Sequence, residues 1–271
     1  MKYAIKFYQE CGILDEVDEL IIKYFERNIN IFDFIENHKS QRIIMDITEH
    51  LEYKSDLDIF KALKEKYDNF SLMLSTSQVS FVDTLISAGI SFFFAQGAVT
   101  PDMLEYFLNM GVSDVYIMNE MCFNLKEISK ICKEKNVKIR VFPNIAQSST
   151  TDIEDSDIVM NTATFFFIRP EDLDVYEQYV DVYEFYGPLD TQPVNYDIYK
   201  NKRKWDSSLS LLIYNLEEEF YGDAIIPIFG KRRAECNKRC IYNNCTLCKD
   251  IAKVSENMAN INAGFGVENE H

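Results

Sequence analysis

Apolar and polar positions alternate in short blocks along the chain, and the blocks change from strand-like to helix-like periodicity and back. Runs rich in β-branched and aromatic residues predict eight strands. These runs span residues 2–8, 42–47, 70–74, 90–95, 115–118, 138–142, 164–168 and 182–185. Segments with helical periodicity separate most of them, which is typical of parallel βαβ units.

Helix signals mark several of the intervening segments. Asp15–Phe25 places apolar side chains at helical spacing and predicts an amphipathic helix. Thr100 is the expected N-cap of a helix over Pro101–Met110, since proline is favoured at the first helical position. Gly89 and Gly111 follow apolar periodic segments and predict helix ends in the left-handed conformation.

The count of eight strands favours a closed barrel over an open doubly wound sheet. No G-x-G-x-x-G motif follows any of the runs, so a dinucleotide-binding sheet has no fingerprint here. The predicted fold class is therefore α/β, a TIM-like (β/α)8 barrel over residues 1–190. A C-terminal cysteine-rich extension follows over 191–261, beginning with a loop to about Asn201 and closing with a helix from about Cys245. Residues 262–271 are expected to form a flexible tail.

Charge narrows the choice of partners. The 271 residues include 28 Lys and Arg and 44 Asp and Glu, a formal net charge of −16. This balance argues against binding duplex DNA over a broad surface, because the phosphate backbone is also anionic. No apolar run approaches the ~18 residues of a membrane span, and the N-terminus does not resemble a signal peptide. We therefore expect a cytoplasmic protein that does not enter a membrane.

In a parallel barrel the active site lies at the carboxyl ends of the strands. Asp46 interrupts an apolar run there, and a carboxylate in such surroundings needs a partner. Arg169 is a candidate partner, or a bidentate ligand for an anionic substrate; the alternative is an ion pair that locks the barrel mouth. With Glu171 and Glu184, these residues are the candidate catalytic set.

Four of the seven cysteines lie close together: Cys236, Cys240, Cys245 and Cys248 form a C-x3-C-x4-C-x2-C segment. Four thiolates in one short segment suit a tetrahedral site for Zn²⁺ or an iron–sulfur cluster. Residues 231–240 hold five basic side chains and one acidic side chain, which would offset thiolate charge. The spacing matches neither a zinc ribbon nor a ferredoxin run, so it leaves both metals open.

Three stretches resemble the barrel domain of the U32 peptidase (collagenase-like) family and its barrel-only relatives. They are Val115–Ser148, Phe166–Gly187 with its I-R-P-E-D-L segment, and Cys236–Ala252. The resemblance implies a TIM-like barrel, and in several relatives four cysteines hold a [4Fe–4S] cluster. Relatives commonly carry cysteines after the sixth strand as well, where this chain has none. The resemblance favours a [4Fe–4S] cluster over zinc and implies RNA base modification or oxygen-independent hydroxylation.

The sequence therefore predicts a U32-like barrel with a four-cysteine metal centre that acts at the barrel mouth on a small or nucleic-acid-derived substrate. One alternative is a non-catalytic barrel in which the cysteines hold a structural zinc ion. Peptidase activity of the U32 type is a weaker alternative, because no nucleophile–base pair or metallohydrolase motif supports it. The residues alone leave open whether the protein is an enzyme, and which oligomer it forms.

Overall fold

A computed structural model gives the fold. It describes residues 2–7, 16–24, 30–38, 41–50, 53–145, 167–186, 192–205 and 212–213, together with the single positions 231, 234, 246, 250, 253 and 257. Eight parallel strands lie in this part of the chain. They are β1 (Lys2–Phe7), β2 (Glu19–Lys23), β3 (Arg42–Asp46), β4 (Phe70–Leu74), β5 (Ser91–Phe94), β6 (Asp114–Tyr116), β7 (Lys138–Val141) and β8 (Val182–Glu184).

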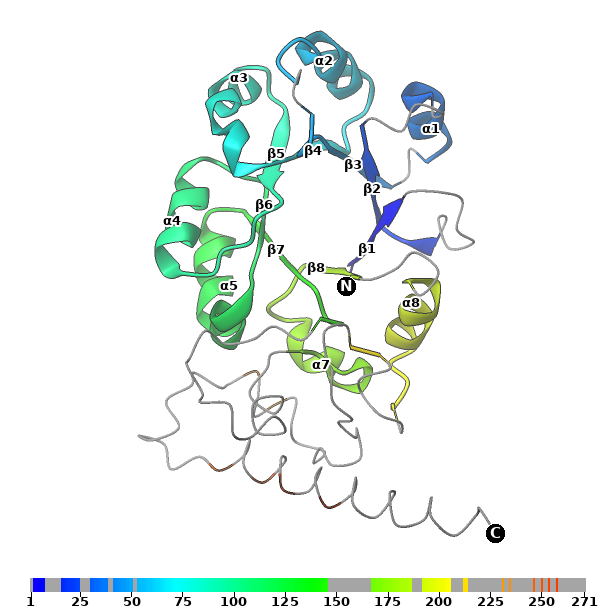
Figure 1. Cartoon of the computed structure of the whole chain (residues 1–271), viewed down its shortest axis with the longest axis vertical. Coiled ribbons are helices and arrows are strands. Elements are labelled where there is room, and N and C mark those ends of the chain that lie inside the picture. The colour runs from blue at the N-terminus through cyan, green and yellow to red at the C-terminus, as the bar shows by residue number, and fades with distance from the viewer. Residues whose placement is uncertain are drawn as a thin grey trace, which may run out of the picture.

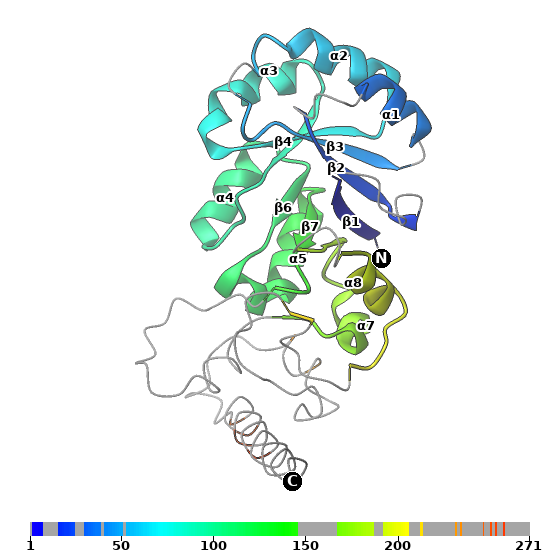
Figure 2. The ribbon, with the colours of Figure 1, turned by 45° about the vertical axis from the view of Figure 1, so that its right-hand side comes forward.

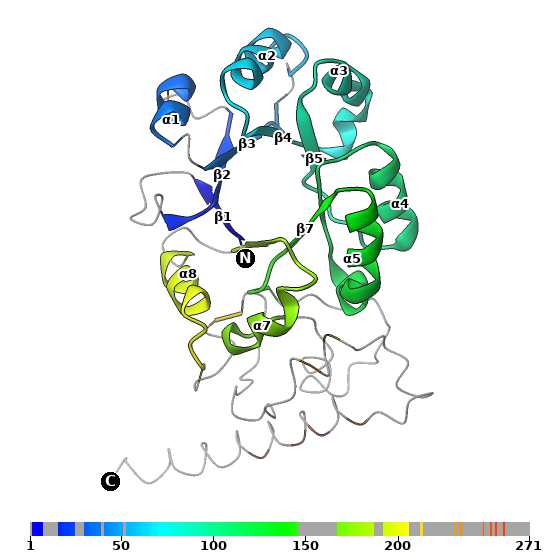
Figure 3. The same cartoon turned by 180° about the vertical axis from the view of Figure 1, so that it is seen from behind.

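The strands form one sheet in the order β5-β4-β3-β2-β1-β8-β7-β6, and every pair is parallel. The two outer strands approach each other and close the ring (Figures 1 and 3). Ser113 N donates to Phe92 O at 2.8 Å, and Ala98 pairs with Ile117 just beyond the strand ends. The predicted (β/α)8 barrel is therefore confirmed.

Helices surround the ring on its outer side (Figure 1). They are α1 (Ile31–Asn37), α2 (Leu57–Lys66), η2 (Thr76–Phe81), α3 (Val82–Ser87), α4 (Pro101–Asn109), η3 (Asn119–Asn124), α5 (Leu125–Glu134), η4 (Pro170–Asp172), α7 (Leu173–Tyr176) and α8 (Gln192–Lys200). One continuous apolar core joins the helices to the sheet. In the described part of the chain, no helix has the length and apolar character needed to span a membrane.

The local signals at helix ends act as expected. Thr100 Oγ1 accepts a hydrogen bond from Met103 N at 3.3 Å, and Pro101 is the first residue of α4. Gly89 and Gly111 have φ of +66° and +74°, the left-handed region that glycine enters without a steric penalty. These residues end α3 and α4 and turn the chain towards the next strand.

The helix predicted over Asp15–Phe25 is wrong, because Glu19–Lys23 is strand β2. Glu19, Leu20, Ile21 and Ile22 are all buried in succession, since β2 has the barrel interior on one side and the helical layer on the other. A strand buried on both faces loses its alternating pattern. Its apolar positions then also match helical spacing, and α1 supplies the helix that precedes β3.

The predicted strand over 164–168 is also not confirmed. Residues 164–166 lie outside the described part, and Phe167 and Ile168 are not in a strand. Ile168 N donates to Pro143 O at 3.0 Å, and Ile168 O accepts from Tyr199 O–H at 2.7 Å. The backbone N–H and C=O of Ile168 therefore have hydrogen-bonding partners in a loop and in helix α8, and not in a neighbouring strand. The barrel still has eight strands because β2 is the one that the sequence pattern missed.

Helix α8 occupies the segment that was predicted to be a loop up to about Asn201. Pro193 is its second residue, a position where the absent N–H costs nothing because the first turn lacks intrahelical acceptors. Tyr196 meets the Tyr3 ring edge-on at 5.4 Å, and Tyr199 lies 5.3 Å from the Phe185 ring. The helix lies beside η4 and α7 (Figure 2). The helical layer of the barrel thus continues beyond residue 190.

Candidate functional site

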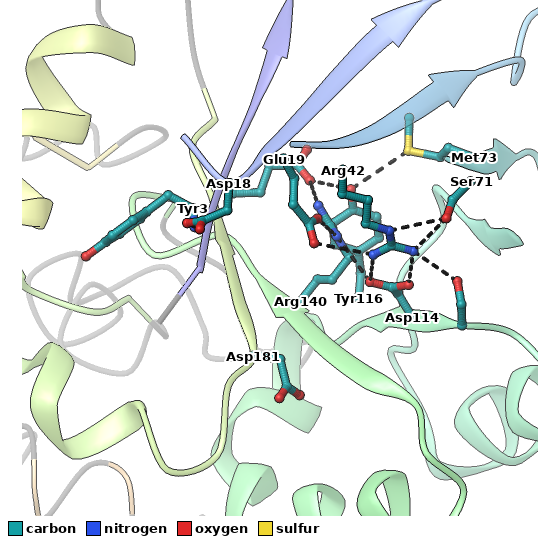
Figure 4. A network of polar contacts seen from close by, with 12 residues as sticks. Tyr3, Asp18, Glu19, Arg42, Ser71, Met73, Asp114, Tyr116, Arg140 and Asp181 are labelled. Atoms are coloured by element: carbon teal, nitrogen blue, oxygen red, sulfur yellow. Dashed lines mark hydrogen bonds and ion pairs between the residues drawn. The ribbon is translucent and has the colours of Figure 1, made fainter. Parts of the chain in front are cut away.

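Acidic and basic side chains fill the centre of the barrel, where aliphatic layers are usual. Five strands contribute one each: Glu19, Arg42, Asp114, Arg140 and Glu184. The first four of these are labelled in Figure 4. We call these five residues the inner charge network. Register places Glu19 beside Arg42, and Ala4 of β1 pairs with both Glu19 and Glu184. The small side chain of Ala4 leaves room for its charged neighbours.

Arg140 is the hub of the inner charge network. Its Nη1 lies 2.5 Å from Glu19 Oε2 and 3.2 Å from Asp114 Oδ1, and its Nη2 lies 3.3 Å from Glu184 Oε2. The side chain is fully buried, and its guanidinium lies 5.0 Å from the centre of the Phe93 ring. A buried cation needs such partners, because loss of its hydration is otherwise uncompensated.

Arg42 forms a bidentate pair with Asp114, with both N–O distances at 2.6 Å. It also donates to Ser71 Oγ, from Nε at 3.2 Å and from Nη2 at 2.9 Å. Burial by itself raises the pKa of Asp114, but the hydrogen bonds and charges of Arg42 and Arg140 outweigh burial. The pKa of Asp114 is therefore held well below its usual value, and the carboxylate is ionised.

Glu184 accepts a short hydrogen bond from Tyr116 O–H, 2.5 Å to Oε2. Burial and the Glu184 carboxylate raise the pKa of Tyr116 well above its usual value, so the phenol keeps its proton. Phe142 stacks on Tyr116 at 5.1 Å, and the Tyr186 ring lies 5.9 Å from Phe142. These rings lie on the carboxyl side of the network. Glu184 is thus enclosed in the barrel and fully buried.

Asp46 ends β3 at the barrel mouth and is buried. Its Oδ1 accepts from Thr48 N at 3.0 Å and from Thr48 Oγ1 at 2.6 Å. The hydrogen-bonding partner of this carboxylate is thus Thr48 in the adjoining turn, and not the expected Arg169. No ion pair between Asp46 and Arg169 occurs among the described residues.

Arg169 is also buried, directly before η4. It binds Asp172 through Nε at 2.6 Å and Nη2 at 2.9 Å, and its Nη1 lies 3.1 Å from Glu171 Oε1. Burial raises the pKa of Glu171, and the Arg169 charge opposes that effect. The structure thus brings Arg169 and Glu171 together and adds Asp172. The same arrangement fits the alternative of an ion pair that rigidifies the barrel mouth.

A buried histidine that was not among the predicted site residues, His50, lies shortly after β3 and contacts an aspartate and a tyrosine. His50 Nε2 is 2.6 Å from Asp56 Oδ2, and the Tyr24 ring lies 5.0 Å from the imidazole. Burial and a hydrogen bond with Asp56 raise the pKa of Tyr24 to about 12. Asp56 precedes α2 without capping it, because its carboxylate binds His50. No spacing motif joins these residues, so the sequence offered no signal.

The four cysteines Cys236, Cys240, Cys245 and Cys248 lie outside the described residues. Within the described part, no group of three or more His, Cys, Asp or Glu side chains could hold a metal ion. Cys122 and Cys132 are buried, and burial raises the pKa of the Cys132 thiol to about 11. Near the predicted closing helix, Asp250 N donates to Thr246 O at 2.9 Å, the spacing of a helical turn.

Comparisons with known proteins do not assign the chain to a family. No protein-family model and no curated protein matches the chain. Among solved structures, it is similar to the 4-hydroxy-2-oxoglutarate aldolase/2-deydro-3-deoxyphosphogluconate aldolase from TTHB1. The two share 12% identity over 74% of this chain and 92% of that one, with a TM-score of 0.35. A likeness at this level carries no argument about fold or activity. The chain is a (β/α)8 barrel. This conclusion rests on its own eight parallel strands.

Proposed function

We propose that the chain is a U32-like barrel protein in which Cys236, Cys240, Cys245 and Cys248 hold a metal centre. A [4Fe–4S] cluster is preferred over zinc, and the substrate is a small or nucleic-acid-derived molecule at the carboxyl ends of the strands. The proposed reaction is a modification of the hydroxylation type. The C-x3-C-x4-C-x2-C segment is the single observation that carries this proposal.

The donor set suits such a centre. Four thiolates match the ligand requirement of an iron–sulfur cluster and of tetrahedral zinc. The hydrogen bond from Asp250 N to Thr246 O has the i to i−4 spacing of an α-helix and supports the prediction of a closing helix from about Cys245, at whose start the helix dipole would favour thiolates. The basic residues of 231–240 would offset the negative charge of the loaded site. Reduced thiols fit the cytoplasm, the compartment that we propose.

The residues at the barrel mouth would bind and orient the substrate. Arg169 is fixed by Asp172 and Glu171, so its guanidinium is pre-oriented for an anionic group without further loss of side-chain entropy. Asp46 is held in place by Thr48. Glu184 is fully buried and accepts a hydrogen bond from Tyr116 O–H, so we propose that it positions Tyr116 and does not contact substrate. A bound cluster would supply electron transfer.

Anaerobic purification of the full chain, followed by iron, sulfide and zinc quantitation, tests the proposal. We expect about four iron and four sulfide per chain. The variant Cys248→Ser should lose most of this iron. Cys132→Ala is the matched control, since this thiol is buried in α5, and it should keep its iron. A colourless protein with one zinc per chain would overturn the redox proposal, and a protein without either metal would overturn the metal centre itself.

The second candidate function is a non-catalytic barrel with a structural zinc site. The observation that favours it is that polar side chains at the barrel mouth already have partners within the chain. Arg169 is bound to two carboxylates, and Asp46 is bound to Thr48. This alternative predicts that Cys248→Ser mainly lowers the melting temperature, because metal binding is coupled to folding. A variant that keeps its melting temperature but loses an activity would rule it out.

A further inference from the structure

A cavity of about 380 Å³ opens at the amino ends of the strands, opposite the expected active-site mouth. Strand β3 contributes Arg42 to its wall, β4 Ser71, β5 Ser91 and β7 Lys138. Residues at the amino end of a barrel usually serve stability. A cavity of this size is nevertheless within the range of small-molecule sites. Its polar wall distinguishes it from a packing defect, which would be apolar.

Lys138 is the unusual member of this wall. It is half-buried, and its ammonium forms no ion pair or hydrogen bond with any residue that the structure describes. The other cations of the cavity are engaged: Arg42 binds Asp114, and Lys133 donates to Gln178 O at 3.0 Å. Burial lowers the pKa of Lys138, and the positive charge of Arg42 lowers it further, while the carboxylates of Asp114 and Glu19 oppose part of this shift. An anion beside this ammonium would offset the lowering that remains.

The hydroxyl groups of Ser71 and Ser91 line the same cavity. Ser71 Oγ accepts two N–H groups from Arg42, so its own proton is left to donate elsewhere. Ser91 has no hydrogen-bonding partner for its side chain among the described residues. Two hydroxyl donors and one ammonium match the acceptor oxygens of an oxyanion. The carboxylates of Asp68 and Asp181 on the same wall disfavour a large polyanion.

We propose that this amino-end cavity binds a small oxyanion of the size of phosphate. The Lys138 ammonium is its charge partner, and the Ser71 and Ser91 hydroxyls donate hydrogen bonds to it. Arg42 reaches the anion only indirectly, because its guanidinium is held by Asp114 and orients Ser71. The site lies at the other end of the barrel from the proposed substrate site, and it does not depend on the metal centre.

Inorganic phosphate is the probe, titrated into the full-length protein by calorimetry at constant ionic strength. Saturable binding is expected, with a rise in the melting temperature. Lys138→Met should weaken phosphate binding about 10- to 100-fold, the range for one lost charge-assisted hydrogen bond. Lys130→Met is the matched control, because Lys130 lies on α5 and pairs with Glu127 at 3.0 Å in solvent. Its affinity for phosphate should equal that of the wild type.

A second measurement uses the wild-type protein alone, in case Lys138→Met fails to fold. Phosphate should slow reductive methylation of Lys138 and leave Lys130 unaffected, as mapped by mass spectrometry. Chloride at the same ionic strength should protect neither lysine. Equal phosphate affinity of the wild type and a folded Lys138→Met variant would overturn the proposal, as would methylation of Lys138 that ignores phosphate. The iron content of Lys138→Met and Lys130→Met should be the same. A failure of the phosphate proposal can therefore be told apart from a failure of the metal-centre proposal.

Discussion

Replacement of Arg140 by methionine tests whether the inner charge network is held together by its central cation. Arg140 lies within 3.3 Å of three carboxylates, those of Glu19, Asp114 and Glu184. Methionine has a similar length and is apolar, so it keeps the contacts with Phe93 and creates little empty volume. The substitution therefore removes the charge with limited change in packing. Glu19 and Asp114 would then share Arg42, and Glu184 would keep its hydrogen bond from Tyr116 O–H.

The expected cost follows from the burial of these groups. Removal of one partner from a buried ion pair costs about 3–5 kcal/mol, because the remaining charge is left without compensation. All three carboxylates have side chains with 0% exposure, so solvent cannot screen them. We expect the free energy of unfolding at pH 7 to fall by about 3–5 kcal/mol. The melting temperature should fall by roughly 6–20 °C, at about 2–4 °C per kcal/mol for a chain of this size.

Urea denaturation followed by circular dichroism measures this loss. The matched control is Arg203→Met, since Arg203 pairs with Asp197 at 3.0 Å with 60% of its side chain exposed. An exposed pair contributes less than about 1 kcal/mol, so the control should be close to the wild type. For Arg140→Met, the deficit should narrow between pH 7 and pH 5, because proton uptake neutralises a buried carboxylate that has lost its partner.

An Arg140→Met protein within about 1 kcal/mol of the wild type would refute the reasoning, since it would mean that the carboxylates tolerate the loss of their cation. A deficit that widens on acidification would contradict the assignment of the cost to unpaired negative charge. A loss equal to that of Arg203→Met would show that burial does not distinguish the two arginines.

Three further outcomes are expected. The lowered pKa of Asp114 stabilises the fold above the unfolded value of about 4, and this contribution is lost as the pH falls below it; urea titrations should show a weaker acid dependence in Asp114→Asn. Thr100→Ala removes the N-cap of α4 and should cost about 1 kcal/mol in the same assay, whereas Thr100→Ser should restore most of it. Cys122 and Cys132 should resist alkylation at pH 8 until the protein is unfolded, because burial raises the pKa of both thiols; labelling in the native state would contradict their burial.

Local signals predicted several elements well, because their causes lie within a few residues. The cap at Thr100 and the left-handed glycines Gly89 and Gly111 depend on backbone geometry that the neighbouring residues set. Strand β2 was missed because both of its faces are buried, and a run of buried residues has no period of its own. Helix α8 was missed because Pro193 and its polar neighbours were interpreted as loop signals, although proline is tolerated in a first turn.

The candidate site was only partly predictable. Arg169 and Glu171 were singled out because they follow the predicted strand 164–168; that strand is not confirmed, yet the two side chains do lie together. The inner charge network was not foreseen, although Lys138 and Arg140 alternate with apolar residues and thus mark the inner face of β7. A buried arginine in the sequence predicts that it has partners, but not which ones.

By itself the sequence determined most of the alternation of strands and helices that favours a barrel, and the four-cysteine segment from which we propose a metal centre; its count of eight strands is correct only because the missed β2 balances the unconfirmed strand over 164–168. Only the tertiary structure decided which charges meet. Glu19 and Arg140 are separated by 121 positions, yet their side chains lie 2.5 Å apart because the closed sheet places β2 and β7 around one interior. The pattern of apolar residues along the chain indicates which side chains are buried. Contacts across the barrel depend on strand order and register, which are settled by the packing of the whole sheet.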